Sequence, residues 1–126
     1  MALPRVLFVD DDENRKHEFE KHIKSLCEEI VWANTAIKGI ELLRENEFDL
    51  IFLDHDMGLG LNGLDVTCCL YRSKNVRATI VIHTINIPAS FSMEKVLLDM
   101  GMNALRISFC KEDFFEVVKQ LIRDSL

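Results

Sequence analysis

The chain contains five short runs of apolar residues. Each run is followed by a segment in which apolar residues have helical spacing. The runs are Arg5–Val9, Ile30–Ala33, Asp49–Asp54, Ala78–His83 and Ala104–Ile107. Apolar residues follow one another in these runs instead of alternating with polar ones, a pattern typical of parallel strands covered on both faces. The sequence therefore predicts five buried, parallel β-strands.

The segments between the runs have the three- and four-residue spacing of amphipathic helices. In the first, Asn14 can cap a helix whose apolar face includes Phe19 and Ile23. The other helices are expected after Asn34-Thr35, over about Leu64–Arg72, across Met93–Met100 and over Lys111–Ser125. Strands that alternate with helices predict an α/β fold, and right-handed crossovers make it a three-layer sandwich.

Composition narrows the class of protein. With 126 residues, 48% of them apolar, we expect one globular domain over 1–126. The net charge of −6, with no cluster of Lys and Arg, argues against nucleic acid as the main partner. The N-terminal apolar run is too short for a signal peptide or a membrane span. Four cysteines without metal-ligand spacing predict reduced core cysteines and a cytoplasmic protein.

Polar residues stand where the predicted strands end. Asp10–Asp12 follow the first strand, Asp54–Asp56 end the third, and His83-Thr84 end the fourth, while Ser108 follows the fifth. In a parallel sheet the carboxyl ends of the strands share one edge, which is where ligands bind. These polar groups are therefore expected to converge on one site.

Several carboxylates in one place repel each other unless a cation or a proton lies among them. Mg²⁺ suits oxygen ligands and keeps waters that a phosphate can replace. Asp10, Asp11 and Asp54 thus predict a Mg²⁺ site with one carboxylate free for chemistry. In the alternative interpretation, Asp10–Asp12 only cap the first helix and stay solvated, which leaves Asp54 unexplained.

The segments "VLFVDDDENRK", "FDLIFLD" and "NGLDV", with Thr84 after the fourth strand, resemble the receiver domain of response regulators. The resemblance implies a flavodoxin-like sheet in the order 2-1-3-4-5, in a single receiver-like domain over 1–126 without an output domain. It also implies that Asp11, Asp54 and the backbone carbonyl of Asp56 bind Mg²⁺, with Asp10 acting through water. Asp54 would be the phosphate acceptor.

Departures from that family are concentrated at its signalling residues. Ser108 and Phe109 stand where receivers have a Lys followed by Pro, and Leu105 replaces the usual aromatic residue of strand five. After the acceptor, Met57 is followed by Gly58 instead of Pro. The first two differences argue against ordinary phosphorelay signalling.

The same departures form a pattern of their own. "LDHDMG…NG" and "IVIHTINIPASFSM" resemble the cyclic-phosphate-processing branch of receiver domains. The positions that match are His55, Asp56, His83, Thr84 and Asn86. This resemblance implies that Asp54, His83, His55 and Thr84 take part in catalysis, with Asn86 and Ser108 elsewhere in the pocket.

The two histidines near Asp54 differ in what the sequence predicts. His83 is either a core histidine bonded to backbone or a proton donor and acceptor near neutral pH. His55 follows Asp54 directly, so its side chain points elsewhere and we expect it at the rim of the loop. Arg15 and Lys16 are expected on a solvated helix face.

Three functions stay open at this level. The first is a Mg²⁺-dependent hydrolase of a cyclic phosphate or phosphodiester, with a phosphorylated small molecule as substrate. The second is a phosphorelay protein that takes a phosphoryl group on Asp54 from a histidine kinase or phosphotransfer partner. The third is a pseudo-receiver that only binds a partner. Neither a nucleic acid nor a membrane is expected as partner, and the receiver resemblance implies a homodimer through the last helix and its neighbouring strand.

Overall fold

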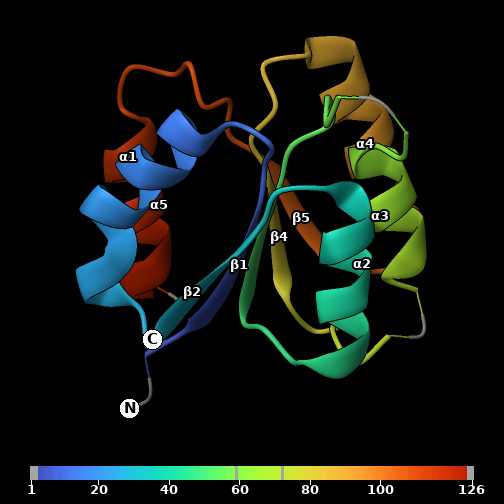
Figure 1. The fold of residues 1–126 in the computed structure, drawn as a ribbon, viewed down its shortest axis with the longest axis horizontal. Coiled ribbons are helices and arrows are strands. Elements are labelled where there is room, and N and C mark those ends of the chain that lie inside the picture. Colours follow the sequence, from blue (N-terminus) through green and yellow to red (C-terminus); the bar gives the residue numbers. More distant parts are fainter. Residues whose placement is uncertain (1–2, 59, 72, 125–126) are drawn as a thin grey trace.

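A computed structural model describes residues 3–58, 60–71 and 73–124 of the chain. It contains a five-stranded sheet with helices on both faces (Figure 1). The strands are β1 (Arg5–Val9), β2 (Glu29–Ala33), β3 (Leu50–Leu53), β4 (Thr79–Ile82) and β5 (Asn103–Arg106). All neighbouring strands are parallel, in the order β2-β1-β3-β4-β5, which confirms the predicted fold and its topology.

The helices divide into two layers, as Figure 1 shows. On one face of the sheet lie α1 (Glu13–Ile23), which runs into a short 3-10 turn at Lys24–Leu26, and α5 (Phe114–Asp124). The other face carries α2 (Ala36–Glu45), α3 (Gly63–Cys69) and α4 (Ile87–Asp99). The sheet is therefore the middle layer of a three-layer sandwich.

Alternation along each strand sends side chains into two separate cores. Leu7 and Val9 of β1 face the core under α2, α3 and α4, together with Ile51 and Leu53 of β3. Phe8 faces the core under α1 and α5, where Phe52 and Phe19 pack against it. Burial on both faces explains why the strands read as continuous apolar runs.

Several element boundaries differ from the prediction because local hydrogen bonds decide them. Asp12, not Asn14, caps α1, and its side chain accepts from the backbone N–H of Arg15 at 3.0 Å. Helix α5 begins at Phe114, three residues later than Lys111. The predicted helix ends at Arg72 and Ser125 lie outside the described residues.

The prediction of core cysteines is wrong for three of the four. Cys27 is buried, whereas Cys68, Cys69 and Cys110 are exposed, and all four are free thiols. A cysteine's place on a helix or loop follows from the packing of its neighbours, which the spacing of four cysteines does not reveal.

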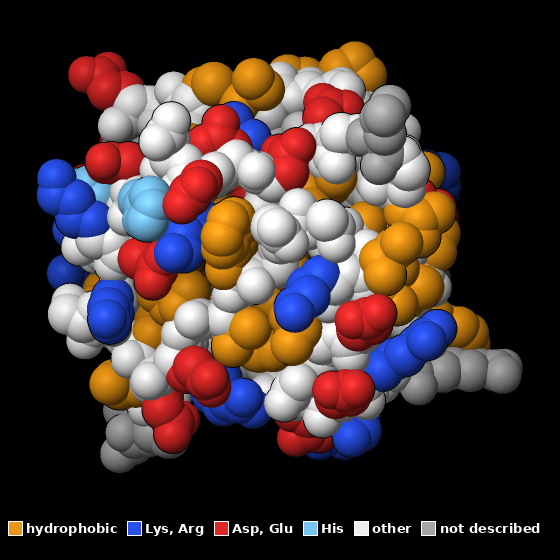
Figure 2. Space-filling view, viewed as in Figure 1, with side chains coloured by type: hydrophobic (Ala, Val, Ile, Leu, Met, Phe, Trp, Pro, Cys, Tyr) orange, Lys and Arg blue, Asp and Glu red, His pale blue; other side chains and the backbone are white. Residues whose placement is uncertain are grey.

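The surface shows mixed charge. On the face drawn in Figure 2, acidic and basic side chains lie next to each other, and hydrophobic side chains are scattered among them. Within the described part of the chain, none of the helices combines the length and apolar composition needed to cross a membrane.

Candidate functional site

Three buried side chains meet at the carboxyl edge of the sheet: Asp10, Asp54 and His83, each at most 4% exposed. Each directly follows its strand, and the ladder of hydrogen bonds continues into it. Backbone N–H groups of Asp10 and Asp54 donate to the next strands at Ala33 O (3.1 Å) and Val9 O (3.0 Å), and that of His83 donates to Leu53 O (3.0 Å). The predicted convergence of these positions is thus a property of the sheet itself.

The side-chain alternation places all three on the same face. Asp10 lies two residues after Phe8, and Asp54 two residues after Phe52, so both point toward α1 and α5. His83 stacks on Phe8 with ring centroids 4.8 Å apart. The polar cluster therefore covers the upper end of the aromatic core.

Asp10 is the centre of the hydrogen-bond network. Its Oδ1 accepts from the Asp12 backbone N–H (2.8 Å) and Arg15 Nη2 (3.0 Å). Its Oδ2 accepts from Arg15 Nε (2.9 Å) and contacts His83 Nε2 (2.8 Å). Burial raises the pKa of Asp10, but the hydrogen bonds from His83 and Arg15 outweigh it and lower the pKa to about 2. The carboxylate is ionised and fully bonded.

Arg15 is the residue that the sequence analysis placed wrongly. Its side chain is 29% exposed and reaches back over the sheet edge, where Nη2 lies 3.3 Å from Asp54 Oδ2 and 3.8 Å from Asp11 Oδ1. The hydrogen bonds with Asp10 raise its pKa further above its ordinary value. Because Asp12 caps α1, Arg15 stands in the first turn, close enough to neutralise the acidic cluster.

A carboxylate holds the side chain of His83. In the core-histidine interpretation, the backbone would have been its partner. Its Nε2 contacts Asp10, and since an ionised carboxylate only accepts, Nε2 carries the proton of this bond. Phe109 lies edge-on to the ring, with centroids 6.0 Å apart. Nδ1 is the buried side-chain polar atom without a partner among the described residues. A lone pair on Nδ1 is therefore left for a proton or a ligand.

Asp54 follows β3 at the centre of the sheet. Its Oδ1 accepts from the backbone N–H of His55 at 2.9 Å. Burial raises the pKa of Asp54, and the negative charge of Asp10 adds to the rise, whereas His83 and the hydrogen bond from Thr84 oppose it. A cation beside Asp54 favours its ionised form, and the guanidinium of Arg15, at 3.3 Å, is one such cation.

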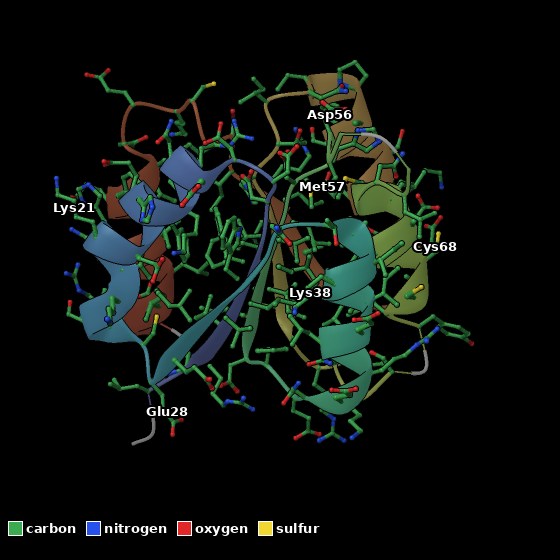
Figure 3. All side chains as sticks on the ribbon, in the orientation of Figure 1. Lys21, Glu28, Lys38, Asp56, Met57 and Cys68 are labelled. Carbon is green, nitrogen blue, oxygen red and sulfur yellow. The ribbon has the colours of Figure 1, made fainter. Side chains whose placement is uncertain are left out.

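His55, Asp56 and Asn86 form a separate contact at the rim. His55 Nδ1 lies 2.9 Å from Asp56 Oδ1, and Asn86 Nδ2 donates to Asp56 Oδ2 at 3.3 Å. The hydrogen bond from His55 lowers the pKa of Asp56. Asn86 also caps α4 by accepting from the backbone N–H of Ala89. Figure 3 labels Asp56 above the strands, beside α4. The three residues connect the loop after β3 to the start of α4.

The oxygen donors at this edge fit a hard divalent cation. Asp10, Asp54 and His83 offer ligand atoms within 4.8 Å of one another. Asp11 lies at the mouth of the site, with its side chain 37% exposed, and its Oδ2 is 3.8 Å from where a side chain on Gly58 would begin. Asp10 already accepts from Arg15 and contacts His83, so Asp11 and Asp54 are freer to bind a metal ion.

A pocket of about 200 Å³ opens beside these groups. Its lining includes Arg15, Asp54, Asp56, His83, Thr84 and Phe109. Ser108 stands next to Phe109 after β5, and its hydroxyl accepts from the backbone N–H of Cys110 at 3.3 Å. Of the predicted site residues, four line this pocket: Asp54, Asp56, His83 and Thr84. The lining also includes Arg15 and Phe109, which the sequence did not assign to the site.

Comparison with known proteins agrees with this architecture. A family model described as the cyclic-phosphate processing receiver domain matches residues 5–99. The receiver domain of a sensor histidine kinase from Pseudomonas aeruginosa, solved with a magnesium ion in its active-site cleft, is 19% identical with a TM-score of 0.75. That match covers 98% of this chain and 97% of the other.

Two further solved structures are similar in fold. A CheY-like receiver domain from Methanospirillum hungatei is 21% identical, with a TM-score of 0.75 and coverage of 98% of this chain and 96% of its own. The phosphorylated cyanobacterial phytochrome response regulator RcpA is 19% identical at the same TM-score of 0.75, covering 95% of this chain and 91% of its own. No curated protein matches the chain.

Proposed function

This chain belongs to the family of cyclic-phosphate processing receiver domains, and we propose that it hydrolyses a cyclic phosphate or a related phosphodiester in the pocket between Asp54 and His83. The observation that carries the proposal is the buried Asp10–His83 pair. Its contact of 2.8 Å and the unpartnered Nδ1 supply a held imidazole beside an acidic pocket. Such a pair is suited to proton transfer.

The acidic residues would hold the metal ion. Asp11, Asp54 and the backbone carbonyl of Asp56 would bind Mg²⁺, which when bound polarises a phosphate oxygen. The contacts of Asp56 with His55 and Asn86 hold the loop that carries this carbonyl. In this proposal His55 and Asn86 position the loop and do not touch the substrate.

His83 would move the proton in the chemical step. Nδ1, which is buried in this structure, would accept a proton from a water molecule that enters with the substrate, as the water oxygen bonds to phosphorus. Asp10 would stabilise the imidazolium that forms. The P–O bond of the ester breaks, and the oxygen that leaves takes the proton from His83. One water is consumed and a phosphomonoester results, which for a cyclic phosphate is the opened ring.

A second candidate function is phosphoryl transfer to Asp54 from a histidine kinase or phosphotransfer protein. Thr84 favours it, since it lines the same pocket as Asp54 and lowers the pKa of that carboxyl group. Against it, Ser108 stands two residues after β5, at the position where receiver domains have a lysine. Phosphoryl transfer would produce a stable acyl phosphate on Asp54.

Hydrolysis is tested with Mg²⁺ and a panel of cyclic mononucleotides, followed by phosphorus NMR. We expect the wild-type protein to open at least one of them, and His83→Gln to be slower by about 100-fold or more, the usual size of acid–base catalysis. Asp54→Asn should also lose activity. His17→Gln is the matched control, because His17 is 60% exposed on α1 and pairs only with Glu13 there.

The acceptor function is tested in parallel by incubation with Mg²⁺ and acetyl phosphate and measurement of the intact mass. A stable adduct that Asp54→Asn abolishes, without hydrolysis of any cyclic phosphodiester, would overturn the proposed hydrolase in favour of phosphorelay. If the protein forms no adduct, hydrolyses no cyclic phosphodiester and does not bind Mg²⁺, the function that remains is that of a binding module.

A further inference from the structure

Arg15 has no part in the chemistry just described, although it lies at the centre of the charged cluster. We propose that Arg15 binds the phosphate of the substrate, and that it becomes free to do so when Mg²⁺ takes its place beside Asp54. The inference rests on the proposed function only in assuming that Mg²⁺ and a phosphate group bind in this pocket.

The contacts of Arg15 differ in length, and the longer ones are those that a bound metal ion would break. The two hydrogen bonds to Asp10 measure 2.9 and 3.0 Å and involve both Nε and Nη2. The contacts with Asp54 and Asp11 are longer, at 3.3 and 3.8 Å. A metal ion bound by Asp54 and Asp11 would therefore displace the weaker contacts and leave the paired bonds to Asp10 in place.

Electrostatics makes the two cations competitors. In this structure, the guanidinium of Arg15 is the counter-charge for two buried carboxylates, Asp10 and Asp54. A divalent cation at Asp54 would lie close to the same guanidinium, in a partly buried region where repulsion is only weakly screened. Arg15 then lowers the affinity for Mg²⁺ unless an anion binds between the two cations.

A phosphate group is the anion that fits this position. Arg15 is the one Lys or Arg among the described residues that line the pocket. Lys111, the nearest basic residue after β5 in the chain, pairs with Asp113 at 3.0 Å and is half exposed. The planar fork of a guanidinium matches two phosphate oxygens, and Nη1 makes only a 3.7 Å contact with Asp12. Mg²⁺ and phosphate should therefore bind cooperatively, with Arg15 as the link.

The test measures binding instead of activity. Isothermal titration calorimetry gives the affinity for Mg²⁺ alone and for inorganic phosphate with Mg²⁺ present. For Arg15→Gln we expect opposite changes: Mg²⁺ binds about tenfold more tightly, because a competing charge is gone, and phosphate binds about tenfold more weakly. Arg15→Lys keeps the charge but not the fork, so its Mg²⁺ affinity should stay near that of the wild type while phosphate binding falls.

Arg123→Gln, on the exposed side of α5, is the matched control and should change neither affinity. Trp32 reports on the fold of each variant, since its indole N–H donates to the carbonyl of Asp10 at 2.7 Å and it is the only tryptophan. If Arg15→Gln does not fold, Arg15→Lys carries the test, and unchanged phosphate affinity in Arg15→Lys would then overturn the proposal.

The outcomes separate this inference from the proposed function. Wild-type protein that binds neither Mg²⁺ nor phosphate overturns both. Wild-type protein that binds Mg²⁺ but no phosphate, or an Arg15→Gln variant that binds phosphate as tightly as the wild type, overturns the role of Arg15 alone. Weaker Mg²⁺ binding by Arg15→Gln would equally contradict it, since displacement predicts the reverse.

Discussion

Replacing Gly63 by alanine should destabilise the protein by about 3 kcal/mol and displace the end of β3 that carries Asp54. A Cβ at this position would overlap the carbonyl oxygen of Asp54 and lie 2.9 Å from the Cα of His55. Both are backbone atoms that no side-chain rotation can move away. Gly63 also donates its N–H to the carbonyl of His55 at 3.0 Å, so relief of the clash breaks a hydrogen bond.

The measurement is urea denaturation of Gly63→Ala, followed by Trp32 fluorescence, together with Mg²⁺ titration of the folded variant. Gly39→Ala is the control: Gly39 lies within α2, and its added Cβ would meet side-chain methyl groups, those of Val9 at 3.4 Å and that of Ala33 at 3.8 Å. Because alanine favours a helix interior, we expect Gly39→Ala to change stability by less than about 1 kcal/mol. Equal effects of the two substitutions would show that the loop after β3 relaxes freely.

The positions of Asp10, Asp54 and His83 could be predicted from the sequence because they depend on regular geometry. A parallel sheet brings the residues after its strands to one edge, and the two-residue period of a strand sets the face on which they lie. Each of the three stands immediately after an apolar run, so an error of one residue in a strand boundary does not move it to another edge.

Arg15 could not be placed in the same way, because its position depends on one capping bond. A helix capped by Asn14 would carry Arg15 on a polar, solvated face, and the apolar spacing of α1 is equally compatible with that outcome. The cap is in fact Asp12, whose side chain bonds the N–H of Arg15 at 3.0 Å. Contacts that long side chains make across elements have no period in the sequence, and this also explains why Phe109 was missed.

The contacts of Asp56 could be predicted only in part from the sequence. Resemblance to the family selected His55, Asp56 and Asn86, and the sequence placed His55 on the rim of the loop. The structure joins them through the two oxygens of Asp56. Whether they act in catalysis stays a prediction, since their contacts describe how the loop is held and not what it binds.

Asp10→Asn should destabilise the protein at neutral pH by about 3 kcal/mol, because it removes the negative charge from a carboxylate that Arg15 and His83 share. Asp10 is fully buried and accepts hydrogen bonds on both oxygens. An asparagine presents an N–H₂ group in place of one oxygen, so Arg15 loses one of its two acceptors, and either His83 or the Asp12 N–H loses its acceptor as well. His83 can adapt only by moving its proton to Nδ1, which is the tautomer that the proposed chemistry excludes.

The loss of stability caused by Asp10→Asn should be smaller in acid. The direction of this change follows from the pKa of Asp10. That pKa is lowered from 3.8 to about 2 in the folded protein. The stabilisation by the ionised carboxylate is therefore complete above pH 4 or so, and it is lost as the pH falls through about 2. The difference in free energy of unfolding between wild type and Asp10→Asn should shrink by about 1 kcal/mol between about pH 6 and pH 3.

Urea denaturation across this pH range measures the difference, with Asp99→Asn as the control. Asp99 forms a surface pair with Lys95, its side chain is 66% exposed, and its replacement should cost less than about 0.5 kcal/mol. The difference in free energy of unfolding between wild type and Asp10→Asn could instead stay constant from neutral to acid pH. The loss of stability would then come from the changed shape of the side chain and not from its lost charge. The buried carboxylate would then be a packing element, and the imidazolium of His83 would lack the counter-charge that proton transfer requires.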